Sequence, residues 1–146
     1  MKLVGVTIAG NSATNRGGGL WTYRVAARMR GTVLADNTAP AGPDCYSVSF
    51  FGEPVQLISR GYNLIEDDAD CSMRATLPTD VIGADPMLGP LAANGGPTRT
   101  HALLAGSPAI DAGIPVVGSG FFACRAQDQR GFPRNGPCDI GAYEAP

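Results

Sequence analysis

The sequence predicts an all-β protein, and three observations predict it. Glycine (20) and proline (12) make up more than a fifth of the 146 residues, yet 44% of the residues are hydrophobic, which indicates a turn-dense fold with a core. Lysine occurs only at Lys2 and glutamate is scarce, so the charged residues that usually cover helix surfaces are nearly missing. Short β-branched runs also recur between turn residues, as strands do.

Two segments of the chain align with each other. Residues 6–13 (VTIAGNSA) match residues 32–39 (TVLADNTA), and each is a short β-branched run that ends in a small residue and asparagine. A weaker third copy begins at Asn63. Irregular repeats of this kind are typical of a parallel β-helix, in which each repeat forms one coil and like residues stack.

The repeat register predicts which side chains stack. One aliphatic residue per coil is expected to point into a single continuous core: Ile8, Leu34, Ile65, Leu88, Ile110 and Ile140. Asn11 and Asn37 are expected to lie one above the other at a turn, where a side-chain amide can bond the backbone of the next coil. The glycines at 17–19 mark a second turn.

Residues 25–30 (VAARMR) alternate in character, which predicts a strand with its cations facing outward. The residues expected to face inward are Val25, Ala27 and Met29, and those expected to face outward are Ala26, Arg28 and Arg30. A helix over residues 20–30 is the alternative, but glycines on both sides leave it without caps.

The four cysteines lack the CxxC spacing of a zinc site, and the chain has one histidine. Pairing Cys45 with Cys71 and Cys124 with Cys138 is the nearest-neighbour option among three connectivities, and disulfides would indicate an oxidising compartment. Buried free thiols are the alternative.

The second half of the chain contains distinctive Gly- and Pro-rich phrases. They are DPMLGPL at 85–91, GSPAIDAG at 106–113, DQRG at 128–131 and CDIGAYE at 138–144. With GYNLI at 61–65, they resemble the C-terminal region of bacterial right-handed parallel β-helix repeat proteins grouped as "choice-of-anchor Q" domain proteins, surface or secreted relatives of the polymorphic outer-membrane type.

The resemblance implies fold and location more than chemistry. It implies one right-handed β-helix domain over residues 1–146, with clearer coils in 1–82 and terminal coils plus a Gly/Pro-rich C-terminal cap in 83–146. It also implies a secreted or cell-surface protein, although we expect neither a signal peptide nor a bilayer-spanning run within this sequence. The chain looks like a terminal fragment or a short gene.

Five residues in the C-terminal phrases are expected to hold the cap together: Asp111, Asp128, Arg130, Asp139 and Glu144. Paired carboxylates could serve glycoside hydrolysis. The aspartates stand in turn phrases, however, where a carboxylate accepts backbone N–H bonds or a contact from Arg130. We therefore predict no catalytic residue here, and we interpret His101 as a structural residue because no triad motif accompanies it.

Two further groups are candidates for binding. Asp67, Asp68 and Asp70 offer carboxylates to Ca²⁺, the one cofactor considered, but the segment lacks the acid order of an EF-hand loop and a solvated turn is the alternative. Exposed aromatic rings could stack on sugars, and core packing is the alternative for them. The aromatic candidates are Trp21, Tyr23 and Tyr46, followed by Phe50, Phe51, Phe121 and Phe122.

Charge and repeat architecture together narrow the function. A net charge of −2 with 16% charged residues offers no polybasic stripe, so nucleic acid is not an expected partner. Solenoid faces suit long ligands, which favours a non-catalytic structural or adhesive module that binds polysaccharide. The alternative is a polysaccharide lyase or glycoside hydrolase that acts through surface carboxylates.

The first predicted coil has no coil before it, so Leu3, Val6 and Ile8 would meet water at its upper face. Docking of two such ends about a two-fold axis would cover both. We therefore expect a homodimer through the N-terminal coil. The alternative is a monomer in which a loop aromatic such as Trp21 covers the end.

Overall fold

The computed structural model describes residues 1–48, 56–115, 117 and 123–146, and within them the chain is all-β. Its strands are β1 (Lys2–Val4), β2 (Thr7–Ala9), β3 (Leu20–Tyr23), β4 (Ala27–Arg30), β5 (Val33–Ala35), β6 (Cys45–Val48), β7 (Leu57–Ser59), β8 (Leu64–Ile65) and β9 (Val81–Ile82). Neighbouring strands are parallel in every sheet. These ranges contain no helix that could cross a membrane.

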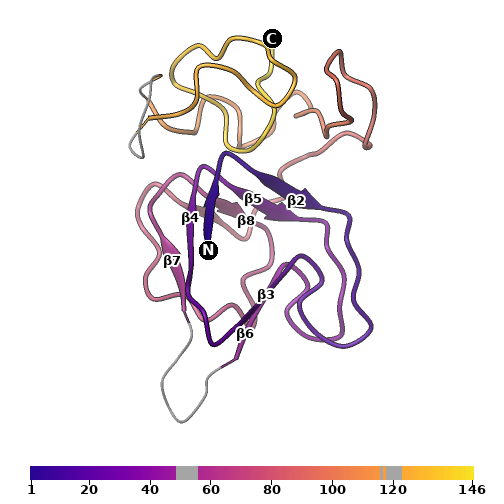
Figure 1. The fold of residues 1–146 in the computed structure, drawn as a ribbon, viewed down its shortest axis with the longest axis vertical. Coiled ribbons are helices and arrows are strands. Elements are labelled where there is room, and N and C mark those ends of the chain that lie inside the picture. Colours follow the sequence, from indigo (N-terminus) through magenta and orange to yellow (C-terminus); the bar gives the residue numbers. More distant parts are fainter. Residues whose placement is uncertain (49–55, 116, 118–122) are drawn as a thin grey trace.

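The strands form three parallel sheets around a common interior (Figure 1). The first sheet has the order β1-β4-β7, the second β2-β5-β8-β9 and the third β3-β6. Lys2 lies opposite Arg28 in the first sheet, and Thr7 lies opposite Val33 in the second. From β1 to β8 the chain therefore visits the three sheets in turn and returns to each of them one coil later, and β9 then joins the second sheet again.

The predicted aliphatic register is confirmed in the first coils. Ile8 pairs with Leu34, and Leu34 pairs with Ile65, with the latter two fully buried. The next partner in the ladder is Ile82, where Leu88 was expected. The chain reaches this strand early because its last coil is short: Ile82 follows Ile65 after 17 residues, whereas the earlier steps, Ile8 to Leu34 and Leu34 to Ile65, span 26 and 31 residues.

A second core lies outside the ring, between the second sheet and the C-terminal segment, residues 84–146. Strand β5 is buried along its whole length, because Leu34 faces the interior while Val33 and Ala35 face outward. The outward side chains pack with a set that includes Leu88, Leu103, Ala109, Ile110, Ile140 and Tyr143. The prediction of one continuous core is therefore wrong for Leu88, Ile110 and Ile140.

The C-terminal segment packs along the side of the coils (Figure 1), which corrects the expectation of a cap on the end of their stack. Two hydrogen bonds fix it there. The Gly141 N–H donates to the carbonyl of Gly31 at 3.0 Å, and the Ala142 N–H donates to the Thr7 hydroxyl at 3.1 Å. The segment lies on the side because the second sheet carries apolar side chains on both faces.

The predicted asparagine stack is confirmed at the corner after the second sheet. The Asn37 side-chain amide donates to the carbonyl of Ile8 at 2.9 Å, one coil away, and its Oδ1 accepts the Asn11 N–H at 3.0 Å. The positive φ angles fall on the preceding residues, Gly10 and Asp36. The asparagines therefore stabilise this corner through the hydrogen bonds of their side-chain amides, and the left-handed backbone conformation belongs to the residue before each of them.

Residues 27–30 form strand β4, so the helical alternative is wrong. Ala27 and Met29 are fully buried and Arg28 is exposed, as the alternation predicts. Val25 was expected inside but is 59% exposed, because it lies in the turn before the strand. Arg30 was expected outside but is only 6% exposed, since its guanidinium stacks over the Tyr62 ring at 5.6 Å.

The structure confirms the predicted cysteine pairing. Cys45 is bonded to Cys71 across neighbouring coils, and Cys124 is bonded to Cys138 within the C-terminal segment. Two disulfides in a small domain are typical of proteins from oxidising compartments.

Candidate functional site

The third sheet presents aromatic side chains on its outer face. In β3 and β6, the inward residues are Leu20, Thr22, Cys45 and Ser47, and the outward ones are Trp21, Tyr23, Tyr46 and Val48. Trp21 lies directly opposite Tyr46 in the parallel register. Trp21 is 59% exposed and Tyr23 is 47% exposed. We call Trp21, Tyr23 and Tyr46 the aromatic strip.

Two arginines that the sequence analysis did not select lie against the aromatic strip. The Arg16 guanidinium lies 5.2 Å from the centre of the Tyr46 ring, and the Arg24 guanidinium lies 5.1 Å from that of Tyr23. Stacking of this kind is attractive because the ring face is electron-rich. Extending the repeat offset of 26 residues to Trp21 points to Ser47, one residue beyond its actual partner Tyr46, and no sequence signal links Arg16 to either ring.

The aromatic strip is suited to binding sugar rings. An indole and a phenol side by side offer flat apolar faces with polar edges, and the stacked guanidinium groups add hydrogen-bond donors for hydroxyl or acid groups. The sheet holds the strip in place, because the Thr22 hydroxyl donates to Ser47 at 2.9 Å on the inner face. The structure thus brings together the three predicted ligand-binding residues; the phenylalanines at 50, 51, 121 and 122 lie outside the described residues.

The C-terminal segment contains a buried carboxylate pair with two arginines. Asp128 Oδ2 accepts a hydrogen bond from Arg130 Nε at 2.8 Å, and the aspartate side chain is 0% exposed. Its Oδ1 accepts the N–H groups of Arg130 and Phe132 at 2.8 and 3.1 Å. The expected pairing of Arg130 with a nearby carboxylate is confirmed.

Glu144 has its own arginine, which the sequence analysis missed. Arg134 Nη1 donates to Glu144 Oε2 at 2.8 Å, and Arg134 Nη2 donates to the Gly141 carbonyl at 2.7 Å. The glutamate also accepts the backbone N–H groups of Asp139 and Asn135. Arg134 lies between the segments 128–131 and 138–144 singled out above, in a run of Gly, Pro and Asn. Nothing in that run indicates which carboxylate it pairs with.

The two carboxylates have pKa values moved in opposite directions. Burial raises the pKa of Asp128, but the hydrogen bonds from Arg130, Glu144 and Phe132 outweigh burial, so its pKa lies below the ordinary value. For Glu144, burial raises the pKa, and the negative charge of Asp139 adds to it. Both shifts follow from interactions within the protein, because every carboxylate oxygen of the pair accepts a hydrogen bond.

Asp139 and Asp111 complete the predicted set. Asp139 is buried, and its Oδ1 accepts the Asp111 N–H at 2.8 Å while its Oδ2 accepts the Ala145 N–H. Asp111 itself is exposed and takes part through its backbone, with a φ of 54°. The structure therefore brings Asp128, Asp139 and Glu144 together as acceptors of backbone hydrogen bonds. Such an arrangement fixes a loop-rich segment.

Carboxylates of the acidic loop, residues 66–70, accept hydrogen bonds from backbone N–H groups of the chain. Asp67 Oδ1 accepts the Ala69 N–H at 2.9 Å, and Asp70 Oδ2 accepts the Gly42 N–H at 3.0 Å. Asp68 is exposed. Across the described part of the chain, no cluster of three or more His, Cys, Asp or Glu side chains is placed to hold a metal ion. His101 Nδ1 lies 2.8 Å from the Gly89 carbonyl, in keeping with its structural interpretation.

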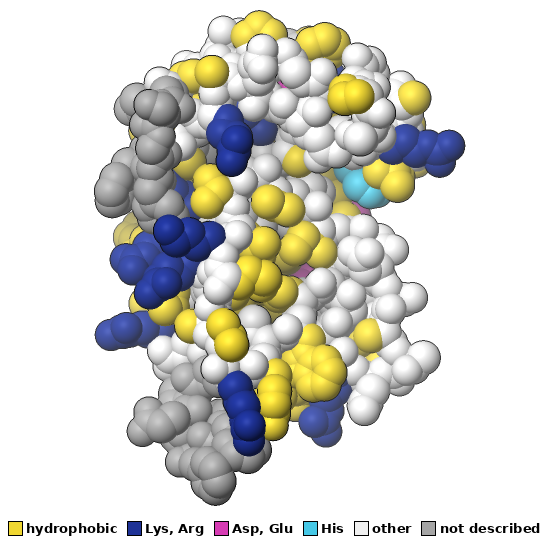
Figure 2. Space-filling view, viewed as in Figure 1, with side chains coloured by type: hydrophobic (Ala, Val, Ile, Leu, Met, Phe, Trp, Pro, Cys, Tyr) yellow, Lys and Arg dark blue, Asp and Glu magenta, His cyan; other side chains and the backbone are white. Residues whose placement is uncertain are grey.

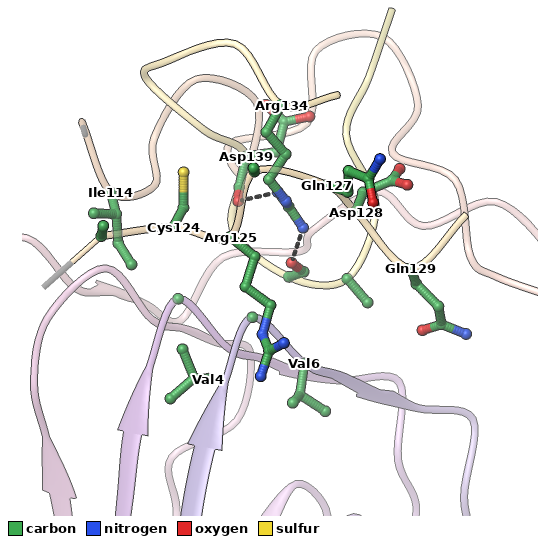
Figure 3. Close-up of a pocket in the computed structure, with 16 residues that line it drawn as sticks. Val4, Val6, Ile114, Cys124, Arg125, Gln127, Asp128, Gln129, Arg134 and Asp139 are labelled. Atoms are coloured by element: carbon green, nitrogen blue, oxygen red, sulfur yellow. Dashed lines mark hydrogen bonds between the residues drawn. The ribbon is translucent and has the colours of Figure 1, made fainter. Parts of the chain in front are cut away.

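A groove of about 980 Å³ lies between the N-terminal strands and the C-terminal segment (Figure 3). Val4 and Val6 lie on one side, and Arg125 extends toward them from the other. Gln127 and Gln129 also line it. The sequence could not indicate this groove, because it forms between segments more than a hundred residues apart.

Comparison with family models, with curated proteins and with solved structures finds no match for this chain.

Proposed function

We propose that this chain is a right-handed parallel β-helix module of a bacterial surface or secreted protein, and that it binds polysaccharide through the aromatic strip without cleaving it. The observation that carries the proposal is the pairing of exposed Trp21 with Tyr46 on the outer face of the third sheet. Neighbouring rings on parallel strands repeat along the coil axis, as sugar units do along a chain.

The three parallel sheets support the β-helix part of the proposal. The first two coils each give one strand to every sheet, and the inward ladder of Ile8, Leu34 and Ile65 runs across the coils. The right-handed course is the one that parallel crossover connections almost always take. The resemblance of the C-terminal phrases to β-helix repeat proteins points the same way, and the two disulfides accord with a location outside the cytoplasm.

The state of the carboxylates supports a binding role over the lyase or glycosidase alternative. A hydrolytic pair needs acid groups that reach a substrate in an open groove. Asp128 and Asp139 line the groove beside Arg125, but both are buried, as is Glu144, and their oxygens accept hydrogen bonds from the chain itself. The hydrogen bonds of these carboxylates stabilise the fold of the C-terminal segment.

The proposal is tested by isothermal calorimetry on a set of soluble polysaccharides, together with a reducing-sugar assay on the same mixtures. Trp21→Ala should abolish measurable binding, because it removes the larger ring of the pair. Leu91→Ala is the matched control, since Leu91 is a similarly exposed apolar side chain (53%) on the C-terminal segment. Binding that survives Trp21→Ala, or release of reducing ends by the wild type, would refute the proposal.

We also propose that two copies associate through the N-terminal coil. Strands β1, β2 and β3 each form an edge of their sheets, so their outer backbone groups offer hydrogen bonds to a second chain. Sedimentation at low micromolar concentration tests this. We expect a dimer that Val6→Asp dissociates, and a mass near 15.0 kDa for the wild type would overturn it.

A further inference from the structure

The outer face of the first sheet is basic. Strands β1, β4 and β7 read KLV, ARMR and LIS, with no acidic residue among them. Their outward positions include Lys2 and Arg28, and Arg60 and Arg74 adjoin them; Arg30 on the same strand as Arg28 is buried against Tyr62. We call Lys2, Arg28, Arg60 and Arg74 the basic face. Figure 2 shows Lys and Arg side chains gathered on the side of the molecule where β4 and β7 lie, with few acidic side chains in view.

The ladder places these cations in rows across the coils. Lys2 lies opposite Arg28, and the next position in that row is Ile58. The Arg74 N–H donates to the Leu57 carbonyl at 3.0 Å, which puts Arg74 beside Ile58 in the same row. Neighbouring strands are about 5 Å apart, so Arg28 and Arg74 stand about 10 Å from each other along the coil axis.

Among the residues that the structure describes, three cations of the basic face have no carboxylate partner. Arg28, Arg60 and Arg74 are exposed, and both ion pairs found among the described residues lie in the C-terminal segment. Like charges on one sheet face repel each other and reduce stability. A protein with net charge −2 that concentrates unpaired cations on one sheet therefore gains no stability from them, which points to a ligand.

The basic face continues into the aromatic strip. Strand β3, which carries Trp21 and Tyr23, is joined to β4 by a short turn, and Arg24 in that turn stacks on the Tyr23 ring. One long ligand that passes around this corner would meet flat rings first and cations next. The two surfaces thus complement the two parts of an acidic sugar, its ring and its acid group.

We propose that the basic face binds an acidic polysaccharide, with Arg28, Arg60 and Arg74 contacting its carboxylate or sulfate groups. This inference rests on the proposed function and names the class of polysaccharide that the module takes. A single linear chain fits better than a duplex nucleic acid or a membrane surface. Lys2, Arg28 and Arg74 follow one row across the coils and the row leads into the aromatic strip around the β3–β4 turn, a path that a flexible linear chain can follow.

The test measures affinity for alginate, a polyuronate, and compares two doubly substituted variants of equal charge. Arg28→Gln/Arg74→Gln should weaken binding about tenfold, because two exposed charge contacts are lost. Arg99→Gln/Arg125→Gln is the control, with both arginines exposed in the C-terminal segment, and should change the affinity less than about twofold. Added salt should weaken wild-type binding and abolish the difference. Circular dichroism checks that both variants fold.

Trp21→Ala, measured on alginate in parallel, separates this inference from the proposed function. Loss of binding in both Trp21→Ala and the Arg28/Arg74 variant supports both. If only the arginine variant loses binding, the basic face binds alginate and the proposed role of the aromatic strip is refuted. If only Trp21→Ala loses binding, the aromatic strip binds alginate and the proposed role of the basic face is refuted. Equal affinity of the two arginine variants, or tighter binding to duplex DNA or to phosphatidylserine vesicles than to alginate, would overturn the inference.

Discussion

The coils and the C-terminal segment are held together in different ways. In residues 1–83, parallel backbone ladders join each coil to the next, and a row of aliphatic side chains fills the interior. In residues 84–146, the described backbone pairs occur as isolated bridges, and buried carboxylates accept the N–H groups that no strand takes up. The coils are thus stabilised by repeated backbone ladders, and the C-terminal segment is stabilised by a few buried charged residues.

This difference determines where the molecule is sensitive to change. A ladder distributes its energy over many similar bonds, so a single surface substitution in a coil has a small effect. A buried carboxylate that serves several N–H groups concentrates energy in one residue, and its loss leaves several polar groups unpaired. The proposed binding surfaces, the aromatic strip and the basic face, both lie on the coils, because stacked strands place similar side chains in rows that a ligand can contact.

The largest effect is expected from Arg134→Met. This change leaves Glu144 buried without its cation, which should lower the free energy of unfolding by about 3–5 kcal/mol at neutral pH. The Glu144 pKa is already raised by burial, and losing the arginine raises it further. Because the folded state then binds the proton more tightly than the unfolded state, the variant should regain stability as pH falls below 7. Urea unfolding at several pH values measures this, and a variant as stable as wild type would contradict the account.

Asn37→Ala should break a corner of the coils that depends on the side chain of a single asparagine. The amide of Asn37 bonds the carbonyls of Ile8 and Ala35 and the carboxylate of Asp44. Leaving these buried acceptors unpaired should cost about 3 kcal/mol in chemical denaturation. Asn11→Ala is the control, because Asn11 is exposed and should cost less than about 1 kcal/mol. Equal losses in the two variants would show that the corner is not organised around Asn37.

Arg130→Ala should lower stability by about 1–3 kcal/mol, less than Arg134→Met, because Asp128 keeps three backbone N–H donors. The arginine helps to hold the Asp128 pKa below its ordinary value, so its contribution exists above the unfolded pKa and disappears as pH falls through the folded one. Thermal unfolding at pH 7 and at pH 3 checks the sign. A stability loss that grows on acidification would oppose this explanation.

The smallest effect is expected from Glu66→Gln in the acidic loop. Burial raises the Glu66 pKa, and the charges of Asp36, Asp44 and Asp85 add to it. Removing the charge should stabilise the protein at pH 7 by less than about 1 kcal/mol, and the gain should vanish as pH falls and the wild-type glutamate takes up its proton. Differential scanning calorimetry with Asp68→Asn as a control detects it. A destabilised glutamine variant would show that the glutamate charge is needed there.

The sequence predicted the contacts between equivalent positions of the repeats and the contacts between residues close in the chain. The alignment of residues 6–13 with 32–39 placed Ile8 on Leu34 and Asn11 on Asn37, because stacked coils put equivalent positions in contact. The cysteine pairing and the Arg130 pairing were also predicted, since each cysteine bonds the next cysteine along the chain and Arg130 lies two residues from Asp128.

What the sequence did not predict depends on contacts between distant segments. The outward position of Val33 and Ala35 sets where the C-terminal segment docks, and three consecutive apolar residues do not say what covers them. The basic face was foreseen only at Arg28, because Arg60 and Arg74 join it through loops of unequal length. The aromatic candidates were correct in kind, but their alignment required the register of β3 on β6.

Nuclear magnetic resonance titration of the labelled protein with alginate tests most directly whether the regular coils carry the binding surface. The account predicts chemical-shift changes at the Trp21 indole and at the backbone amides of β3, β4 and β6. The amides of residues 126–144 should stay unchanged. Changes confined to the C-terminal segment, or to the groove formed by Val4, Val6 and Arg125, would contradict it.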